Sequence, residues 1–235
     1  AYRASCQVAA GVVLAAGDYS NGPDLKARFA SPDVVNVDAV NPTATGDGQR
    51  MALELGATVI NGDIVRGPIM RFIPPTRPNL IQKLPPAKFV AQLIAWAMGS
   101  LPQWMLRPFL MSFLTTALGP SPDLYKEGAV LINKNGQRFT DELGKPNLDT
   151  AKQPDRISWI VFDHKLAQKF SAWPDFVSTA PGVAYAYLAD YRRNRADIFH
   201  QSDSVAGLAA SMGVAPDALT RSLAEYNSTR ETRPA

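Results

Sequence analysis

The 235-residue sequence predicts a mixed fold of the α+β type, with strands and helices in two parts. A run of five apolar residues between Gly11 and Gly17 is typical of a strand buried on both faces. An Asn-Gly pair at 135–136, with strand-like runs on either side, predicts a β-hairpin. Residues 216–227 carry apolar side chains at 219, 223 and 226, the spacing of an amphipathic helix.

The first part of the chain combines the predicted strand 11–17 with a predicted helix over residues 49–57. Apolar residues at 51, 52 and 55 give this helix one apolar face, and Gly56 is a suitable C-terminal stop. Two short stretches lie where the strand ends and where the helix begins: Ala15, Ala16 and Gly17, and then Thr45, Gly46, Asp47 and Gly48.

Both stretches suit a ligand site. The small residues at the end of the strand allow a large ligand to approach the backbone. The glycine-rich start of the helix offers free N–H groups and the positive end of the helix dipole to an anionic or electron-rich ligand. Taken singly, each stretch is equally consistent with an ordinary strand end and a capped turn.

The middle of the chain predicts a change of domain. Residues 59–65 read as a strand and turn, and the prolines between 68 and 86 exclude a helix interior there. Helices are then expected over residues 89–98 and 109–118, and neither reaches the roughly 20 apolar residues that span a bilayer. We interpret them as a buried helical hairpin. The alternatives are an apolar lid for a hydrophobic substrate and a dock on a membrane surface with Trp96 and Trp104 at the interface.

The second half begins with the hairpin pattern of residues 128–142, which predicts a strand, a turn between Lys134 and Gln137, and a second short strand. Residues 158–163 predict a further strand, followed by a helix over 164–170.

Three stretches, in this order, resemble the FAD-binding flavoproteins of the fumarate reductase / succinate dehydrogenase / 3-ketosteroid dehydrogenase superfamily. They are the strand and Thr-Gly-Asp-Gly helix start, the Gly-Ala-x-x-x-Asn-x-x-Gly-x-Arg-Phe-x-x-Glu pattern ending at Glu142, and the helix that ends in Tyr-Asn at 226–227. Ala16 and Asp18 differ from the family, which has Thr and Gly there. The resemblance implies a partial FAD-binding subdomain over 1–57 and a substrate-capping domain over 58–235.

The resemblance also implies FAD as the cofactor, held by Ala15, Ala16, Gly17, Thr45, Gly46, Asp47 and Gly48. A Gly-x-Gly-x-x-Gly phosphate-binding turn is absent upstream, so we expect this chain to be the middle of a longer protein and inactive by itself.

The implied chemistry is transfer of a hydride between flavin and a C–C bond next to a carbonyl, with a proton donor or acceptor opposite. Family members that act on fumarate use His and Arg at positions that correspond here to Pro68, Tyr125 and Pro146. Without these cations a dicarboxylate would lack its partners, which favours a small, apolar, steroid-like substrate. The candidate catalytic residues are Tyr125, Arg138 and Glu142.

Other readings of these residues stay open. Tyr125 is also consistent with an ordinary half-buried tyrosine, and Arg138 with Glu142 is consistent with a local ion pair. For the chain as a whole, the alternatives to an oxidoreductase are a non-catalytic fragment or binding module and a lipid-binding domain at a membrane surface. The electron acceptor or donor is not specified by the sequence.

Composition excludes other classes of function. The net charge of +3 is dispersed, with no long basic run, which argues against nucleic-acid binding. Cys6 is the single cysteine, so no internal disulfide forms and a cytoplasmic location is expected. His164 is expected at the surface and His200 at a strand edge, and two histidines so far apart predict no metal site.

Overall fold

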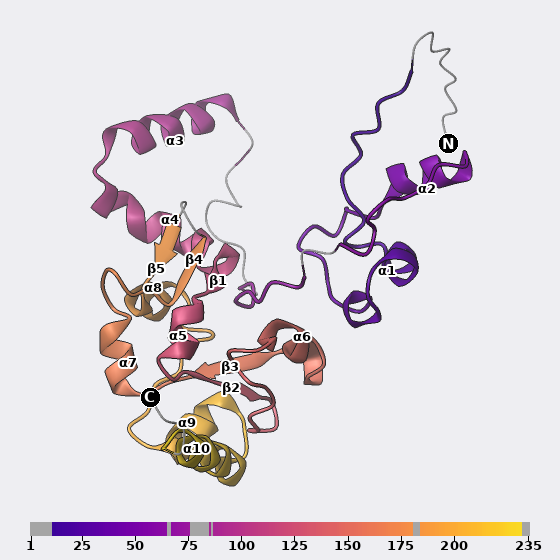
Figure 1. The fold of residues 1–235 in the computed structure, drawn as a ribbon. Coiled ribbons are helices and arrows are strands. Elements are labelled where there is room, and N and C mark those ends of the chain that lie inside the picture. Colours follow the sequence, from indigo (N-terminus) through magenta and orange to yellow (C-terminus); the bar gives the residue numbers. More distant parts are fainter. Residues whose placement is uncertain (1–10, 65–66, 76–84, 86, 181–183, 232–235) are drawn as a thin grey trace. The chain divides into compact units, whose positions relative to one another are not determined.

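The computed structural model describes residues 11–64, 67–75, 85, 87–180 and 184–231 (Figure 1). The chain forms two compact units, Ala1–Pro68 and Ile69–Ala235, each of which is described by itself. The division into subdomains at residues 57 and 58 stays a prediction. Cys6 lies outside the described residues.

The first unit contains short helices joined by irregular chain: α1 (Pro23–Phe29), the 3-10 helix η1 (Pro32–Val34) and α2 (Asp47–Glu54). Helix α2 confirms the helix predicted from residue 49, and it begins two residues earlier. It ends as predicted at Gly56, whose φ of 84° lets the Gly56 N–H bond the carbonyl of Leu53 while the Ala57 N–H bonds that of Ala52.

The buried strand predicted at residues 11–17 is wrong in this structure. The segment is irregular and its apolar side chains are exposed, with Val13 90% exposed. Of the strand and turn predicted at 59–65, the strand is wrong, since the described residues 59–64 contain only a turn at Asn61. A strand needs a hydrogen-bonded neighbour, and the described part of this unit contains no strand that could pair with either segment.

The second unit contains all the strands of the described chain and its longer helices (Figure 1). Its helices are α3 (Lys88–Ser100), α4 (Gln103–Ala117), α5 (Pro122–Lys126), α6 (Pro146–Ala151), α7 (His164–Lys169), α8 (Leu188–Asn194), α9 (Val205–Met212) and α10 (Pro216–Glu231), with a 3-10 turn η3 (Pro154–Arg156). Its strands are β1 (Gly119–Pro120), β2 (Val130–Asn133), β3 (Ser158–Val161), β4 (Ser178–Ala180) and β5 (Ala184–Ala186). The mixed helix-and-strand class predicted from the sequence is confirmed.

Two small antiparallel sheets organise this unit. One has the order β1-β4-β5, and the other pairs β2 with β3 so that Val130 lies opposite Val161. The predicted hairpin is therefore only half right. Its turn forms at Asn133–Gln137, but the second strand is reduced to one bridge between Ile132 and Arg138, and β3 takes the place of the partner.

Strand β2 lies between two apolar cores. Successive side chains of a strand point to opposite faces, so Val130 and Ile132 pack with α9 and α10, while Leu131 packs with the core that contains α4, α5 and α8. All four residues of β2 are buried. The predicted amphipathic helix is confirmed as α10, with Leu219 fully buried against this sheet.

The two apolar helices predicted near residue 100 are present as α3 and α4, separated at Leu101 and Pro102. The predicted start of the second at residue 109 is wrong, because α4 begins at Gln103 and contains Pro108. Their predicted burial holds only for α4, which packs on α8 and contributes buried Met111 and Thr115. Helix α3 contains no buried residue. No helix in the described part of the chain combines the length and the apolar character that crossing a membrane requires. The cytoplasmic location stays a prediction.

Candidate functional site

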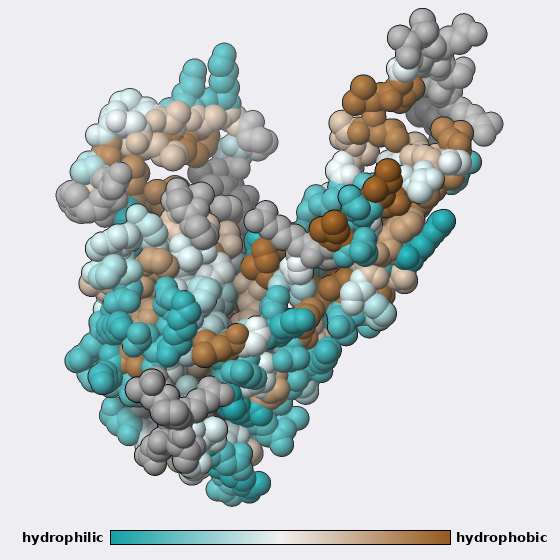
Figure 2. Space-filling view, viewed as in Figure 1, coloured by the Kyte–Doolittle hydropathy of each residue, from teal (hydrophilic) through white to brown (hydrophobic). Residues whose placement is uncertain are grey.

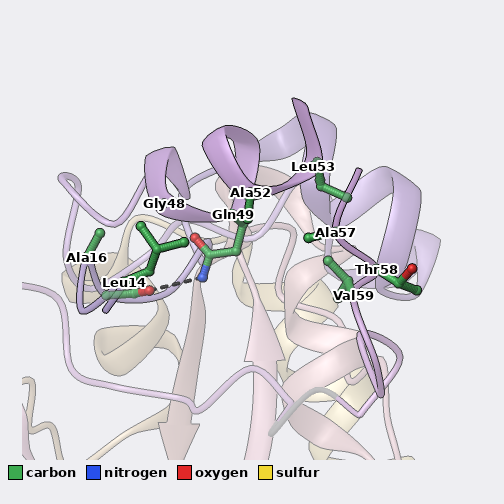
Figure 3. Close-up of a pocket in the computed structure, with 10 residues that line it drawn as sticks. Leu14, Ala16, Gly48, Gln49, Ala52, Leu53, Ala57, Thr58 and Val59 are labelled. Atoms are coloured by element: carbon green, nitrogen blue, oxygen red, sulfur yellow. Dashed lines mark hydrogen bonds between the residues drawn. The ribbon is translucent and has the colours of Figure 1, made fainter. Parts of the chain in front are cut away.

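The first unit contains a pocket of about 150 Å³ between the segment that precedes Gly17 and helix α2. Figure 3 shows Leu14, Ala16 and Gln49 gathered at one end, with Leu53, Ala57 and Val59 toward the other. The lining residues are Leu14, Ala16, Gly17, Gly48, Gln49, Ala52, Leu53, Ala57, Thr58 and Val59. The two stretches that the sequence analysis singled out thus meet at this pocket, although the first is not a strand.

Glycine at position 48 makes this approach possible. A Cβ placed on Gly48 would lie 2.9 Å from the Cβ of Ala16, closer than two carbons tolerate. Gly46 is the N-cap of α2 with φ of 87°, and a Cβ there would lie 2.3 Å from the Leu25 side chain. Both positions therefore require glycine, one to allow the close approach and one to start the helix.

Gln49 is a pocket residue that the sequence analysis missed. Its Nε2 donates a hydrogen bond to the Gly17 carbonyl at 3.0 Å, which ties helix α2 to the opposite wall (Figure 3). Its Oε1 is buried and has no protein partner among the described residues. A buried polar atom is normally satisfied, so this oxygen is free to accept a hydrogen bond from a ligand. The signal available in the sequence was its place in the first turn of the predicted helix.

The remaining predicted cofactor residues, Ala15, Thr45, Gly46 and Asp47, do not line the pocket. Thr45 donates from its hydroxyl to Asp47 at 3.0 Å, and Arg50 pairs with both Asp47 and Asp24. Asp47 is exposed, and neither it nor Thr45 lines the pocket. Ala15 is exposed and also lies outside the lining.

Asp18, which replaces a family glycine, turns its carboxylate back onto the N–H of Ser20 at 2.8 Å. That hydrogen bond holds the pKa of Asp18 below its usual value, so the side chain is charged at neutral pH.

The residues of the pocket fit one edge of a flavin better than the whole of FAD. The walls are small and apolar, α2 supplies N–H groups at its start, and Gln49 supplies one free acceptor. Ligand pockets for larger molecules usually enclose about 300–1,000 Å³, so this pocket covers a part of such a ligand. No three His, Cys, Asp or Glu side chains among the described residues are grouped to hold a metal ion.

In the second unit, Arg138 and Glu142 form the local ion pair that was the alternative interpretation. Arg138 Nη2 lies 2.6 Å from Glu142 Oε2, and Glu142 Oε1 accepts the backbone N–H of Leu131 at 3.0 Å. Glu142 is 5% exposed, and its hydrogen bond raises the pKa of Arg138. Both oxygens are therefore used to fasten the 138–142 turn to strand β2. The guanidinium carbon of Arg138 lies 5.1 Å from the centre of the Tyr226 ring of α10.

Tyr125, unlike Arg138 and Glu142, has a buried polar group without a partner among the described residues. It lies at the end of α5 within the apolar core, 7% exposed, and its hydroxyl has no hydrogen-bond partner among the described residues. Burial, and next the negative charge of Glu142, raise the pKa of Tyr125 far above its usual value. The phenol is therefore neutral at physiological pH, and its hydroxyl can donate a hydrogen bond.

The two histidines contact other residues than Tyr125, Arg138 and Glu142. His164 is exposed, as predicted, and hydrogen-bonds Gln168 at 2.9 Å. His200 is not at a strand edge as predicted but in a loop, where its ring packs edge-on against Trp159.

Comparison with known proteins shows sequence similarity to fumarate reductases. The chain is 26% identical over 219 residues to "Probable fumarate reductase Ifc3" of Shewanella frigidimarina, covering 92% of this chain and 27% of that protein. It is 24% identical over 172 residues to the fumarate reductase of Schizosaccharomyces pombe, covering 71% of this chain and 27% of that protein.

A solved structure shows the same fold. The open conformation of a flavocytochrome c3 fumarate reductase matches 91% of this chain and 28% of its own length, with a TM-score of 0.53 and 24% identity. No protein-family profile matches the chain. The chain thus spans about a quarter of the length of these relatives. The predicted resemblance to fumarate reductase-like flavoproteins is confirmed.

Proposed function

We propose that the chain is part of an FAD-dependent oxidoreductase that transfers a hydride between flavin and a C–C bond next to a carbonyl. The observation that carries the proposal is the close approach of Gly48 to Ala16, with a free acceptor on Gln49 beside it. Similarity to proteins named fumarate reductase supports the same reaction class.

The substrate that we propose is neutral and apolar rather than fumarate. The positions at which the resemblance places cations are Pro68, Tyr125 and Pro146, and Pro146 is the first residue of α6. A dicarboxylate needs paired, charge-assisted hydrogen bonds that these side chains lack. The proposed substrate therefore differs from the one in the names of the relatives.

In this proposal the residues of the chain divide the work. FAD, when bound, accepts or gives the hydride. Gln49 and the first turn of α2 hold and orient its edge, because Gly48 and Gln49 line the pocket and Gln49 Oε1 is left without a partner among the described residues. Tyr125, held neutral by burial, donates a hydrogen bond or proton to the substrate carbonyl. Arg138 and Glu142 act as positioning residues, since they fasten β2 and the turn after it.

The test is flavin binding by the protein produced from the complete reading frame of its gene. We expect the purified protein to show a flavin absorption spectrum that dithionite bleaches. Gly48→Leu fills the space against Ala16, and overpacking of about 1–3 kcal/mol would weaken FAD binding about 5- to 150-fold. Glu54→Gln is the matched control, because it lies on the same helix, is exposed and does not line the pocket.

The readouts are the dissociation constant for FAD by fluorescence quenching and the circular dichroism spectrum of each variant. A folded protein that neither contains flavin nor binds added FAD would refute the proposal and favour a non-catalytic binding module. Reduction of the flavin by succinate, but not by a saturated steroid ketone, would refute the apolar substrate while leaving the flavin chemistry intact.

A further inference from the structure

Helix α3 is an apolar element that the rest of the described chain leaves uncovered. None of its residues is buried. Phe89, Leu93 and Trp96 follow one another at helical spacing and are 68%, 61% and 60% exposed. Figure 2 shows brown and tan atoms of apolar residues along α3, which we call the apolar arm of the second unit.

The side of α3 next to this face is apolar as well. Val90, Ile94 and Ala97 lie there and are half-buried. Lys88 is the single charged residue of the helix. A helix with so wide an apolar surface belongs against a protein core or in lipid, and large exposed apolar patches mark interaction surfaces.

Charge indicates which surface the arm fits. From Ile64 to Pro122 the sequence contains no acidic residue and six basic ones: Arg66, Arg71, Arg77, Lys83, Lys88 and Arg107. The remainder of the chain contains more acidic than basic residues, so the positive net charge comes entirely from this segment. An apolar helix within an exclusively basic segment is complementary to a surface that is both apolar and anionic, which describes a bilayer with acidic headgroups.

Length decides how the arm would meet such a bilayer. The 13 residues of α3 rise about 20 Å, which is short of the roughly 30 Å hydrocarbon core. The helix can therefore lie in the interface but cannot cross it.

Helix α4 fixes α3 to the body of the second unit. It packs on α8, where Arg107 bonds Asp190 at 2.7 Å and lies over the ring of Tyr187. Binding through α3 would therefore bring the whole second unit to the surface.

We propose that α3 docks the protein on the surface of an anionic lipid bilayer, with Phe89, Leu93 and Trp96 inserted below the headgroups and Lys88 among them. This inference does not depend on FAD. It rests on the exposed apolar face, the absence of acidic residues over 64–122 and the length of the helix.

The test is co-sedimentation of the 235-residue chain with vesicles of phosphatidylcholine, with and without an equal share of phosphatidylglycerol. We expect binding to the mixed vesicles that is stronger than to phosphatidylcholine alone. It should weaken between about 0.1 M and 1 M salt, because the screening length falls from about 10 Å to 3 Å. Leu93→Gln/Trp96→Gln should reduce the partition coefficient by about tenfold or more, since two buried apolar side chains are lost.

Trp173→Gln is the matched control. Trp173 is 67% exposed, similar to Trp96, but it lies in the loop after α7. Its ring packs at a tilt against that of Tyr185, with ring centres 5.4 Å apart. Its substitution should leave vesicle binding unchanged. Unchanged circular dichroism spectra in both variants would show that the fold is retained.

Three outcomes would overturn the proposal. The first is no binding to either vesicle, and the second is equal loss of binding in the Trp96 and Trp173 variants. The third is a concentration-dependent dimer in analytical ultracentrifugation that Leu93→Gln/Trp96→Gln abolishes while vesicles do not compete with it, which would assign the face to a second copy of the chain.

Discussion

At the scale of single residues, hydrogen-bond partners separate the candidate catalytic residues more clearly than burial does. Glu142 and Tyr125 are both buried, but both oxygens of Glu142 have partners, whereas the Tyr125 hydroxyl has none among the described residues. An unsatisfied buried donor costs about 1–3 kcal/mol, and a group kept at such a cost suits a role in binding a ligand. Tyr125 is thus the stronger catalytic candidate of the two.

Tyr125→Phe separates a catalytic from a packing role. Removal of an unpaired hydroxyl should leave the free energy of unfolding unchanged or slightly higher. Loss of a proton donor should lower kcat of the complete protein by about 10²- to 10⁴-fold. Urea denaturation and steady-state kinetics with a steroid-like ketone measure the two effects. Unchanged kcat in a stable Tyr125→Phe variant would make Tyr125 a core residue only.

Arg195 and Asp197 predict a pH dependence of stability. Arg195 is 1% exposed, its Nε lies 2.9 Å from Asp197 Oδ1, and another of its nitrogens bonds the carbonyl of Ile73. The hydrogen bond from Arg195 lowers the pKa of Asp197. A carboxyl whose folded-state pKa is depressed stabilises the fold above its unfolded pKa of about 3.9, and this stabilisation is lost as pH falls through the folded value.

Asp197→Asn should therefore be less stable than the parent chain at pH 7, because it leaves a buried guanidinium without its counter-ion. The difference should stay constant above about pH 5 and shrink below pH 4. Urea denaturation at several pH values measures it. A difference that persists at pH 2.5 would show that Asp197 acts through packing and not through its charge.

At the scale of elements, caps and turns follow local chemistry, and strand pairing does not. The end of α2 at Gly56, the start of α7 at His164 and the turn at Gly136 are all present as the sequence predicts. The partner of β2, in contrast, is β3, which follows it by more than twenty residues. The Asn-Gly turn forms without a regular hairpin because the chain after it is held by Ser222 of α10 and by the Arg138–Glu142 pair.

Two glycines offer a matched test of this local chemistry. Gly136 and Gly213 have φ of 78° and 71°, but a Cβ on Gly136 would lie 3.0 Å from that of Ala218, whereas nothing lies within 4 Å of one on Gly213. Gly213→Ala should cost about 1–2 kcal/mol for the left-handed backbone alone. Gly136→Ala should cost roughly 1–3 kcal/mol more, because α10 must move. Urea denaturation measures both, and equal costs would show that α10 yields freely.

At the scale of the whole molecule, the two units carry different parts of the proposed function. The first holds the pocket between Gly48 and Ala16, and the second holds Tyr125 and the apolar arm α3. Exposed apolar residues are found in both units, at Val12 and Val13 as well as on α3. The matched segment covers only 27% of each fumarate reductase compared, so the proposed chemistry belongs to the complete protein.

The sequence by itself determined the helices α2, α3, α4 and α10, the turn at Gly136 and the family resemblance. These depend on residue spacing and on caps within a few positions, which a sequence displays directly. Only the tertiary structure decided that Gln49 lines the pocket and that residues 11–17 are exposed. It also decided that Glu142 accepts a hydrogen bond from β2, and that β3 rather than the chain after the turn pairs with β2. Each of these depends on which distant segment lies alongside, and a strand or a buried polar group is defined by its neighbours rather than by its own residue type.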